Sequence, residues 1–141
     1  MIPSELKSQR TRLTAADIMT THVVTSRPED SLSQVAAVML RHSIGSVAIV
    51  ENKKVVGIIT ERDFVRIVEQ IGLMADKNLA RDHMAKPVVT VQSDTSVADI
   101  VDLMKNKHIR HLIVLDKDRK IVGIISSRDL MTSTGADAMP I

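Results

Sequence analysis

The chain has 141 residues, a formal net charge of +2 and no cysteine. Its length is in the single-domain range and allows a sizeable core, while the lack of cysteine excludes a disulfide framework, a thiolate metal site and a cysteine nucleophile. No apolar run approaches the roughly 20 residues that span a bilayer and the N-terminus lacks a signal-peptide pattern, so we expect a cytoplasmic protein with no membrane contact.

The first half of the chain predicts short strands and helices in alternation. Apolar residues at three- and four-residue spacing indicate the helices, and short apolar runs indicate the strands. The expected elements are a lead-in arm over 1–13, a helical turn opened by Thr14-Ala15-Ala16-Asp17, an extended piece at 23–25, a helix over 31–41, strands at 47–50 and 55–59, and a helix over 60–71.

The second half repeats these elements at an offset of 65 residues, which rises to 66 after the loop at 116–120. Such a period predicts two copies of one unit. Each copy reads strand, helix, strand, strand, helix, so the fold class is α+β, sandwich-like, with two repeats packed in pseudo-twofold symmetry. The boundaries are an arm over 1–13, repeat 1 over 14–72, a linker over 73–81, repeat 2 over 82–131 and a tail over 132–141.

One stretch recurs almost letter for letter, as Gly57–Phe64 and Gly123–Leu130. In each copy a strand turns directly into a helix at a hydroxyl residue, with an aspartate three residues later. This is a capping box, and capping alone would explain it. The same geometry also suits a ligand, because a helix N-terminus presents free N–H groups to phosphate. A nearby arginine can grip phosphate, and the aspartate can accept hydrogen bonds from ribose hydroxyls.

The order and spacing of these fragments resemble a tandem pair of CBS domains, the nucleotide-sensing arrangement called a Bateman module. The resemblance covers about residues 14 to 131. The residues that carry it are Asp17-Ile18-Met19-Thr20, Val23-Val24-Thr25, Ile44-Gly45-Ser46-Val47 and Gly57–Asp63 in the first copy, and Asp82-His83-Met84, Pro87-Val88-Val89-Thr90, Ile109-Arg110-His111-Leu112 and Gly123–Asp129 in the second.

The resemblance implies a non-enzymatic sensor that binds AMP, ADP, ATP or S-adenosylmethionine in clefts between the two repeats. AMP is the expected ligand. One site would use Thr60, Arg62 and Asp63, with Val23 and Ile44 near the base. The other would use Ser126, Arg128 and Asp129, with Val88 and Ile109 near the base. Arg110 and His111, which replace Gly45 and Ser46 of the first copy, would serve as phosphate ligands of either site.

The resemblance also implies a homodimer formed through helices, with apolar faces around Phe64–Ile71 and Leu130-Met131 at the contact. Family modules usually regulate an attached domain. This chain shows no such domain, so we expect the regulated partner to be a separate, unidentified protein.

Rival functions have less support from the residues. No histidine lies beside a nucleophile motif, which argues against catalysis. His108 and His111 lack the helical register of a metal site. A nucleic-acid-associated basic protein is the alternative function, but its lysines and arginines are scattered among 17 acidic residues, and Phe64 is the only aromatic residue available to stack on bases.

Overall fold

The computed structural model describes residues 13–72 and 74–134. It divides into two compact units. Unit 1 combines Met1–His22 with Val89–Ile141, and unit 2 is Val23–Val88. Residues 1–12 of the predicted N-terminal arm and 135–141 of the predicted C-terminal tail lie outside the described residues.

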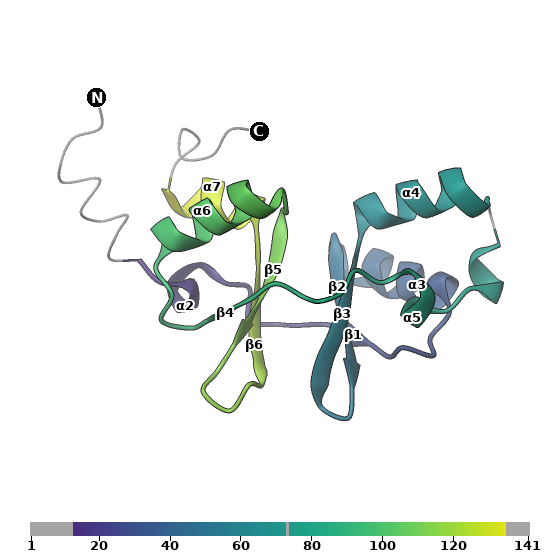
Figure 1. The fold of residues 1–141 in the computed structure, drawn as a ribbon, viewed down its shortest axis with the longest axis horizontal. Coiled ribbons are helices and arrows are strands. Elements are labelled where there is room, and N and C mark those ends of the chain that lie inside the picture. The colour runs from purple at the N-terminus through teal and green to yellow at the C-terminus, as the bar shows by residue number, and fades with distance from the viewer. Residues whose placement is uncertain (1–12, 73, 135–141) are drawn as a thin grey trace. The chain divides into compact units, whose positions relative to one another are not determined.

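Unit 2 holds a three-stranded sheet with the order β1-β2-β3, and its helices cover one face of that sheet (Figure 1). Strand β2 pairs with β1 in parallel and with β3 in antiparallel orientation. The elements are β1 (Thr25–Ser26), α3 (Leu32–His42), β2 (Ser46–Glu51), β3 (Lys54–Thr60), α4 (Glu61–Ile71), a 3-10 turn (Ala75–Lys77) and α5 (Ala80–His83).

Unit 1 repeats this design with the sheet order β4-β5-β6, again with its helices on one face (Figure 1). Its elements are α2 (Ala15–Ile18), β4 (Thr90–Gln92), α6 (Val97–Lys107), β5 (His111–Leu115), β6 (Ile121–Ser126) and α7 (Ser127–Thr134). The predicted order of strand, helix, strand, strand, helix is therefore confirmed twice. The last helix continues to Thr134, three residues beyond the predicted end of repeat 2.

Local sequence signals set the helix ends. Ser31 and Gln34 form the predicted capping box of α3, with Ser31 N–H donating to Gln34 Oε1 at 2.8 Å and Gln34 N–H donating to Ser31 Oγ at 3.1 Å. At the other end, Ser43 adopts φ 53° in the left-handed region. Helix α6 ends in the same way at His108, with φ 55°. The structure thus assigns His108 to a helix end.

Each unit has its own aliphatic core between sheet and helices. In unit 2 the buried members include Leu32, Val35, Ile49 and Ile59, and in unit 1 they include Val97, Ile100, Leu112, Val114 and Ile125. Burying each such side chain contributes about 1.5–3 kcal/mol. Leu40 is an exception, because it follows the apolar spacing of α3 yet is 82% exposed.

The compact units do not follow the repeats in sequence. Helix α2, at the start of repeat 1, belongs to unit 1, where Thr20 and Ile124 exchange two backbone hydrogen bonds of 2.9 and 3.0 Å. Helix α5 belongs to unit 2, where Ala85 and Ile58 exchange bonds of 2.9 and 3.2 Å. The segment around Thr20, at the start of repeat 1, therefore pairs with strand β6 of unit 1. The segment around Ala85, at the start of repeat 2, pairs with strand β3 of unit 2. The repeat limits at 14–72 and 82–131 stay a prediction.

Two glycines of the recurring stretch make room for the segments that pack on the two sheets. A Cβ atom on Gly57 would collide with the side chain of Met84, and a Cβ on Gly123 would collide with Met19. Each methionine therefore packs directly on a strand backbone that lacks a side chain at that position. The glycines are needed for this close approach.

Candidate functional site

The strand-to-helix turn of unit 2 is built on a complete capping box. Thr60 N–H donates to Asp63 Oδ2 at 2.9 Å, and Asp63 N–H donates to Thr60 Oγ1 at 3.2 Å. The Thr60 hydroxyl lies 3.1 Å from the same carboxylate oxygen. The second carboxylate oxygen, Oδ1, forms an ion pair with Arg66 at 3.4 Å. The capping interpretation is thus confirmed, and a ligand role would be added to it.

The turn of unit 1 has the same frame. Ser126 N–H donates to Asp129 Oδ2 at 2.8 Å, and Asp129 N–H donates to Ser126 Oγ at 3.2 Å. Thr132 stands where unit 2 has Arg66. No hydrogen bond or ion pair within the described residues engages Asp129 Oδ1, so that oxygen is available to accept from a ligand hydroxyl.

The segment before the middle strand lies against each turn. Glu61 N–H donates to the Gly45 carbonyl at 3.0 Å, and Ser127 N–H donates to the Arg110 carbonyl at 2.9 Å. In the sheet register, Ser46 stands opposite Thr60 and His111 stands opposite Ser126. Directly opposed residues in an antiparallel pair share one face and have neighbouring side chains. Arg110 and His111 therefore belong beside the turn of unit 1.

Ile44 and Ile109, the expected base contacts, have a structural role of their own. Ile44 N–H donates to the Met39 carbonyl at 3.0 Å, and Ile109 N–H donates to the Met104 carbonyl at 3.1 Å. Together with the left-handed residue before each isoleucine, these bonds form a Schellman motif, which usually carries an apolar contact between the same two positions. Both isoleucines are partly buried against the core of their unit, and a role at the base would be additional.

Val23 and Val88 are matched in sequence but fall in the same unit. Both are partly buried in unit 2, just before the strands that begin at Thr25 and Thr90. Val23 and Val88 are the first and last residues of unit 2, which also contains Thr60, whereas Ile109 and Ser126 are in unit 1. Because the predicted sites lie in clefts between the repeats, the roles of Val23 and Val88 at the base stay a prediction.

The arginines of the two turns are open to solvent. Arg62 and Arg128 are the second residues of α4 and α7 and are exposed, as is Arg110. Among the described residues, none forms an ion pair or a side-chain hydrogen bond with these three guanidinium groups. They are therefore available to bind an anion.

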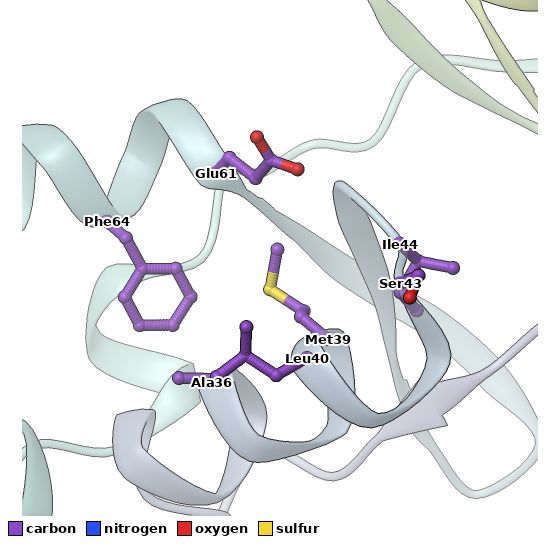
Figure 2. A pocket seen from close by; sticks show the side chains of 7 residues that line it. All are labelled: Ala36, Met39, Leu40, Ser43, Ile44, Glu61 and Phe64. Atoms are coloured by element: carbon purple, nitrogen blue, oxygen red, sulfur yellow. The ribbon is translucent and has the colours of Figure 1, made fainter.

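A hollow of about 430 Å³ lies between α3 and α4 of unit 2. Figure 2 shows the Phe64 ring and the Met39 side chain reaching into the space between these helices, with Glu61 at the end of α4. The lining residues are Ala36, Met39, Leu40, Ser43, Ile44, Glu61 and Phe64. The sequence did not predict this hollow. The apolar spacing of α3 places Leu40 in the core, whereas in the structure Leu40 is exposed and lines the hollow.

The described ranges offer neither a metal site nor a membrane span. No cluster of three histidine, aspartate or glutamate side chains there is placed to hold a metal ion. No helix in the same ranges has the length and apolar character needed to cross a membrane.

Two residues of the turns were missed by the sequence reasoning. These are Glu61 and Ser127, the first residues of α4 and α7. Their difference in charge is visible when the two copies are aligned, and that alignment is the signal that could have found them.

Comparison with known proteins places these features in a family. A family model described as "CBS domain" matches residues 15–70 and again 80–134. An uncharacterized protein of Methanopyrus kandleri is 42% identical over 110 residues, which are 77% of this chain and 56% of that protein. Inosine-5'-monophosphate dehydrogenase of Methanocaldococcus jannaschii is 32% identical over 119 residues, and the match spans only 23% of that enzyme.

A solved structure shows the same fold. The CBS domain pair of protein MJ0100, in complex with 5'-methylthioadenosine and S-adenosyl-L-methionine, superposes with a TM-score of 0.80 at 26% identity. The match covers 89% of this chain and 98% of that one.

Proposed function

The chain belongs to the CBS-domain family, with two such domains in tandem, and we propose that it is a regulatory module that binds an adenine nucleotide. The observation that carries the proposal is the pair of strand-to-helix turns, each with a hydroxyl, a carboxylate and an exposed arginine. The domain pair of protein MJ0100, crystallised with two adenosine-containing ligands, supports the choice of ligand class.

In each turn, different residues would contact the ribose and the phosphate of the ligand. Asp63 and Asp129 would accept hydrogen bonds from the ribose hydroxyls, as acidic residues do in dinucleotide sites. Arg62 and Arg128 would bind phosphate with their guanidinium groups, at the positive end of the helix dipole. AMP is the ligand we expect, because it offers one ribose and one phosphate to this set. The base would meet apolar surface in the predicted clefts between the repeats, from Val23, Ile44, Val88 and Ile109.

Thermal unfolding in the presence of single ligands tests the proposal. AMP, ADP, ATP, S-adenosylmethionine and GTP would each be added to the whole chain. A ligand at about 100 times its dissociation constant stabilises the folded state by roughly 2.7 kcal/mol. We expect the adenosine compounds to raise the melting temperature and GTP to leave it unchanged. Equal shifts with all five compounds, or none with any, would refute adenosine recognition.

Calorimetry on aspartate variants locates the site. Asp63→Ala and Asp129→Ala each remove one charge-assisted contact worth roughly 1.5–3 kcal/mol, so each should weaken its own site about 10- to 100-fold. The capping contact itself is worth only about 1 kcal/mol, so folding should suffer less than binding. Asp99→Ala is a matched control, since Asp99 also follows a helix-capping serine, Ser96. Unchanged affinity and stoichiometry in both test variants would leave only the capping role.

We also propose that the helical face of unit 2 pairs with the same face of a second copy. Leu40 of α3 and Val65 and Val68 of α4 are 82%, 72% and 47% exposed, a high exposure for apolar residues on the helices of one unit. Leu40 protrudes at the rim of the hollow between α3 and α4. A face that carries both a protruding apolar side chain and a hollow can be complementary to itself, as a twofold interface requires. Sedimentation at micromolar concentration should show a dimer.

The regulated protein is expected to be a separate chain. The match to part of a much longer dehydrogenase supports the idea that such a domain pair can accompany an enzyme. A complex with the regulated protein should form or dissociate when AMP is added.

A further inference from the structure

The two turns differ in charge at matched positions. Helix α4 begins with Glu61, whereas α7 begins with Ser127. The backbone N–H of each of these residues donates to the carbonyl of the segment before the middle strand, which is Gly45 in unit 2 and Arg110 in unit 1. One turn therefore has a carboxylate where the other has a hydroxyl, and a glycine where the other has a guanidinium.

In unit 2 the charges around the turn balance. Arg62 and Arg66 offset Glu61 and Asp63, and Arg66 is already paired with Asp63 Oδ1 at 3.4 Å. The exposed Glu61 carboxylate stands in the first turn of α4, where a bound anion would otherwise approach the positive end of the helix. It competes with an anion for the positive end of the helix dipole.

In unit 1 the balance is positive. Among the matched positions, unit 1 has two arginines, Arg110 and Arg128, and one carboxylate, Asp129, and His111 stands opposite Ser126 in the register. Asp129 keeps one oxygen without a bond among the described residues, whereas the matched oxygen of Asp63 is shared with Arg66. This turn can bind an anion and a ribose hydroxyl at once.

From these differences we propose that the turn of unit 1 favours a phosphate-bearing adenosine ligand, whereas at the turn of unit 2 the Glu61 carboxylate offsets Arg62, so that this site gains nothing from phosphate and accepts a phosphate-free ligand at least as well. The inference rests on the proposed function and assigns a ligand class to each of its two sites. A phosphate monoester carries about −1.5 to −2 charges at pH 7. One added or removed unit charge within about 7 Å of it changes binding by roughly five- to tenfold, even at the dielectric constant of water.

Exchanging the two first-turn residues tests this. AMP and 5'-methylthioadenosine are the probes, because both carry adenosine and only AMP carries phosphate. Calorimetry in the Asp63→Ala background reads the unit 1 site, which should prefer AMP. Adding Ser127→Glu should weaken AMP about five- to tenfold and leave methylthioadenosine unchanged. In the Asp129→Ala background, methylthioadenosine should bind at least as tightly as AMP, and Glu61→Ser should strengthen AMP by the same factor.

Glu69→Ser is the matched control. It makes the same charge change on an exposed residue of the same helix, about two turns from the N-terminus of α4, and it should leave the affinity for both probes unchanged. If the wild type binds neither probe, and none of the adenosine compounds raises its melting temperature, the proposed function itself fails. If it binds both, and the exchange of Glu61 and Ser127 leaves both preferences as they were, this inference is wrong while the proposed function stands.

Discussion

Replacing Gly57 with alanine tests the contact that joins the second repeat's leading segment to unit 2. The new Cβ would lie 2.6 Å from Met84 Cγ and 2.9 Å from Met84 Cβ. Contacts below 3.0 Å are too short to keep, and Met84 Cβ cannot move away unless its backbone moves too. That backbone is held by the two hydrogen bonds between Ile58 and Ala85, of 3.2 and 2.9 Å.

The cost follows from these contacts. Overpacking a well-packed site costs about 1–3 kcal/mol, and loss of the two backbone bonds adds roughly 1 kcal/mol for each. We expect Gly57→Ala to lower the free energy of unfolding by about 3–5 kcal/mol, which corresponds to a melting temperature lower by roughly 10 to 17 °C. Thermal unfolding followed by circular dichroism measures this shift, with urea unfolding as an independent measure of the free energy.

A double-mutant cycle with Met84→Ala isolates the collision. Shortening Met84 removes its Cγ and Sδ atoms, so the double variant should be more stable than the sum of the single effects by at least about 1 kcal/mol. Gly72→Ala is the control, because Gly72 has φ 74° and a Cβ added there would meet no atom within 4 Å among the described residues. Gly72→Ala should lower the free energy of unfolding through backbone strain alone, and Met84→Ala should not relieve that loss. Additive effects of Gly57→Ala and Met84→Ala would refute the reasoning.

Three further predictions concern the ligand, the dimer and a helix end. Arg128→Gln should lower the affinity for AMP about tenfold and leave the affinity for adenosine unchanged, as measured by calorimetry, because it removes one charge-assisted contact to phosphate. An equal loss of affinity for both ligands would contradict a phosphate role. Leu40→Glu should shift sedimentation toward the 15.5 kDa monomer, because it places a charge in the proposed apolar contact. Leu40→Met is the control and should leave the dimer intact. A dimer in both variants would exclude this face as the dimer contact. His108→Gly should raise the free energy of unfolding by about 1 kcal/mol, since glycine adopts the left-handed conformation at φ 55° without strain; a lower stability would show that the imidazole makes a contact that outweighs the strain.

The sequence by itself determined the local structure. Ser31 with Gln34 and Thr60 with Asp63 predicted capping boxes that the structure contains, and Gly72 ends α4 as expected. These features involve residues three or four positions apart, whose interactions depend on backbone geometry that the helix itself supplies. The order of elements in both repeats followed from the same short-range patterns and from the recurring stretch.

Only the tertiary structure decided which segments pack together. The repeat pattern groups Met19 with Gly57 and Met84 with Gly123, yet the structure packs Met84 on Gly57 and Met19 on Gly123. Sequence periodicity shows that a methionine and a glycine recur but not which copies meet, because either pairing satisfies the same local pattern. The exposure of Leu40 was also decided by the tertiary structure. Helical spacing places Leu40 near the apolar stripe of α3, but the position of α4 leaves it uncovered by the described side chains of unit 2. Long-range contacts such as these are set by the packing of whole elements, which residue spacing alone does not specify.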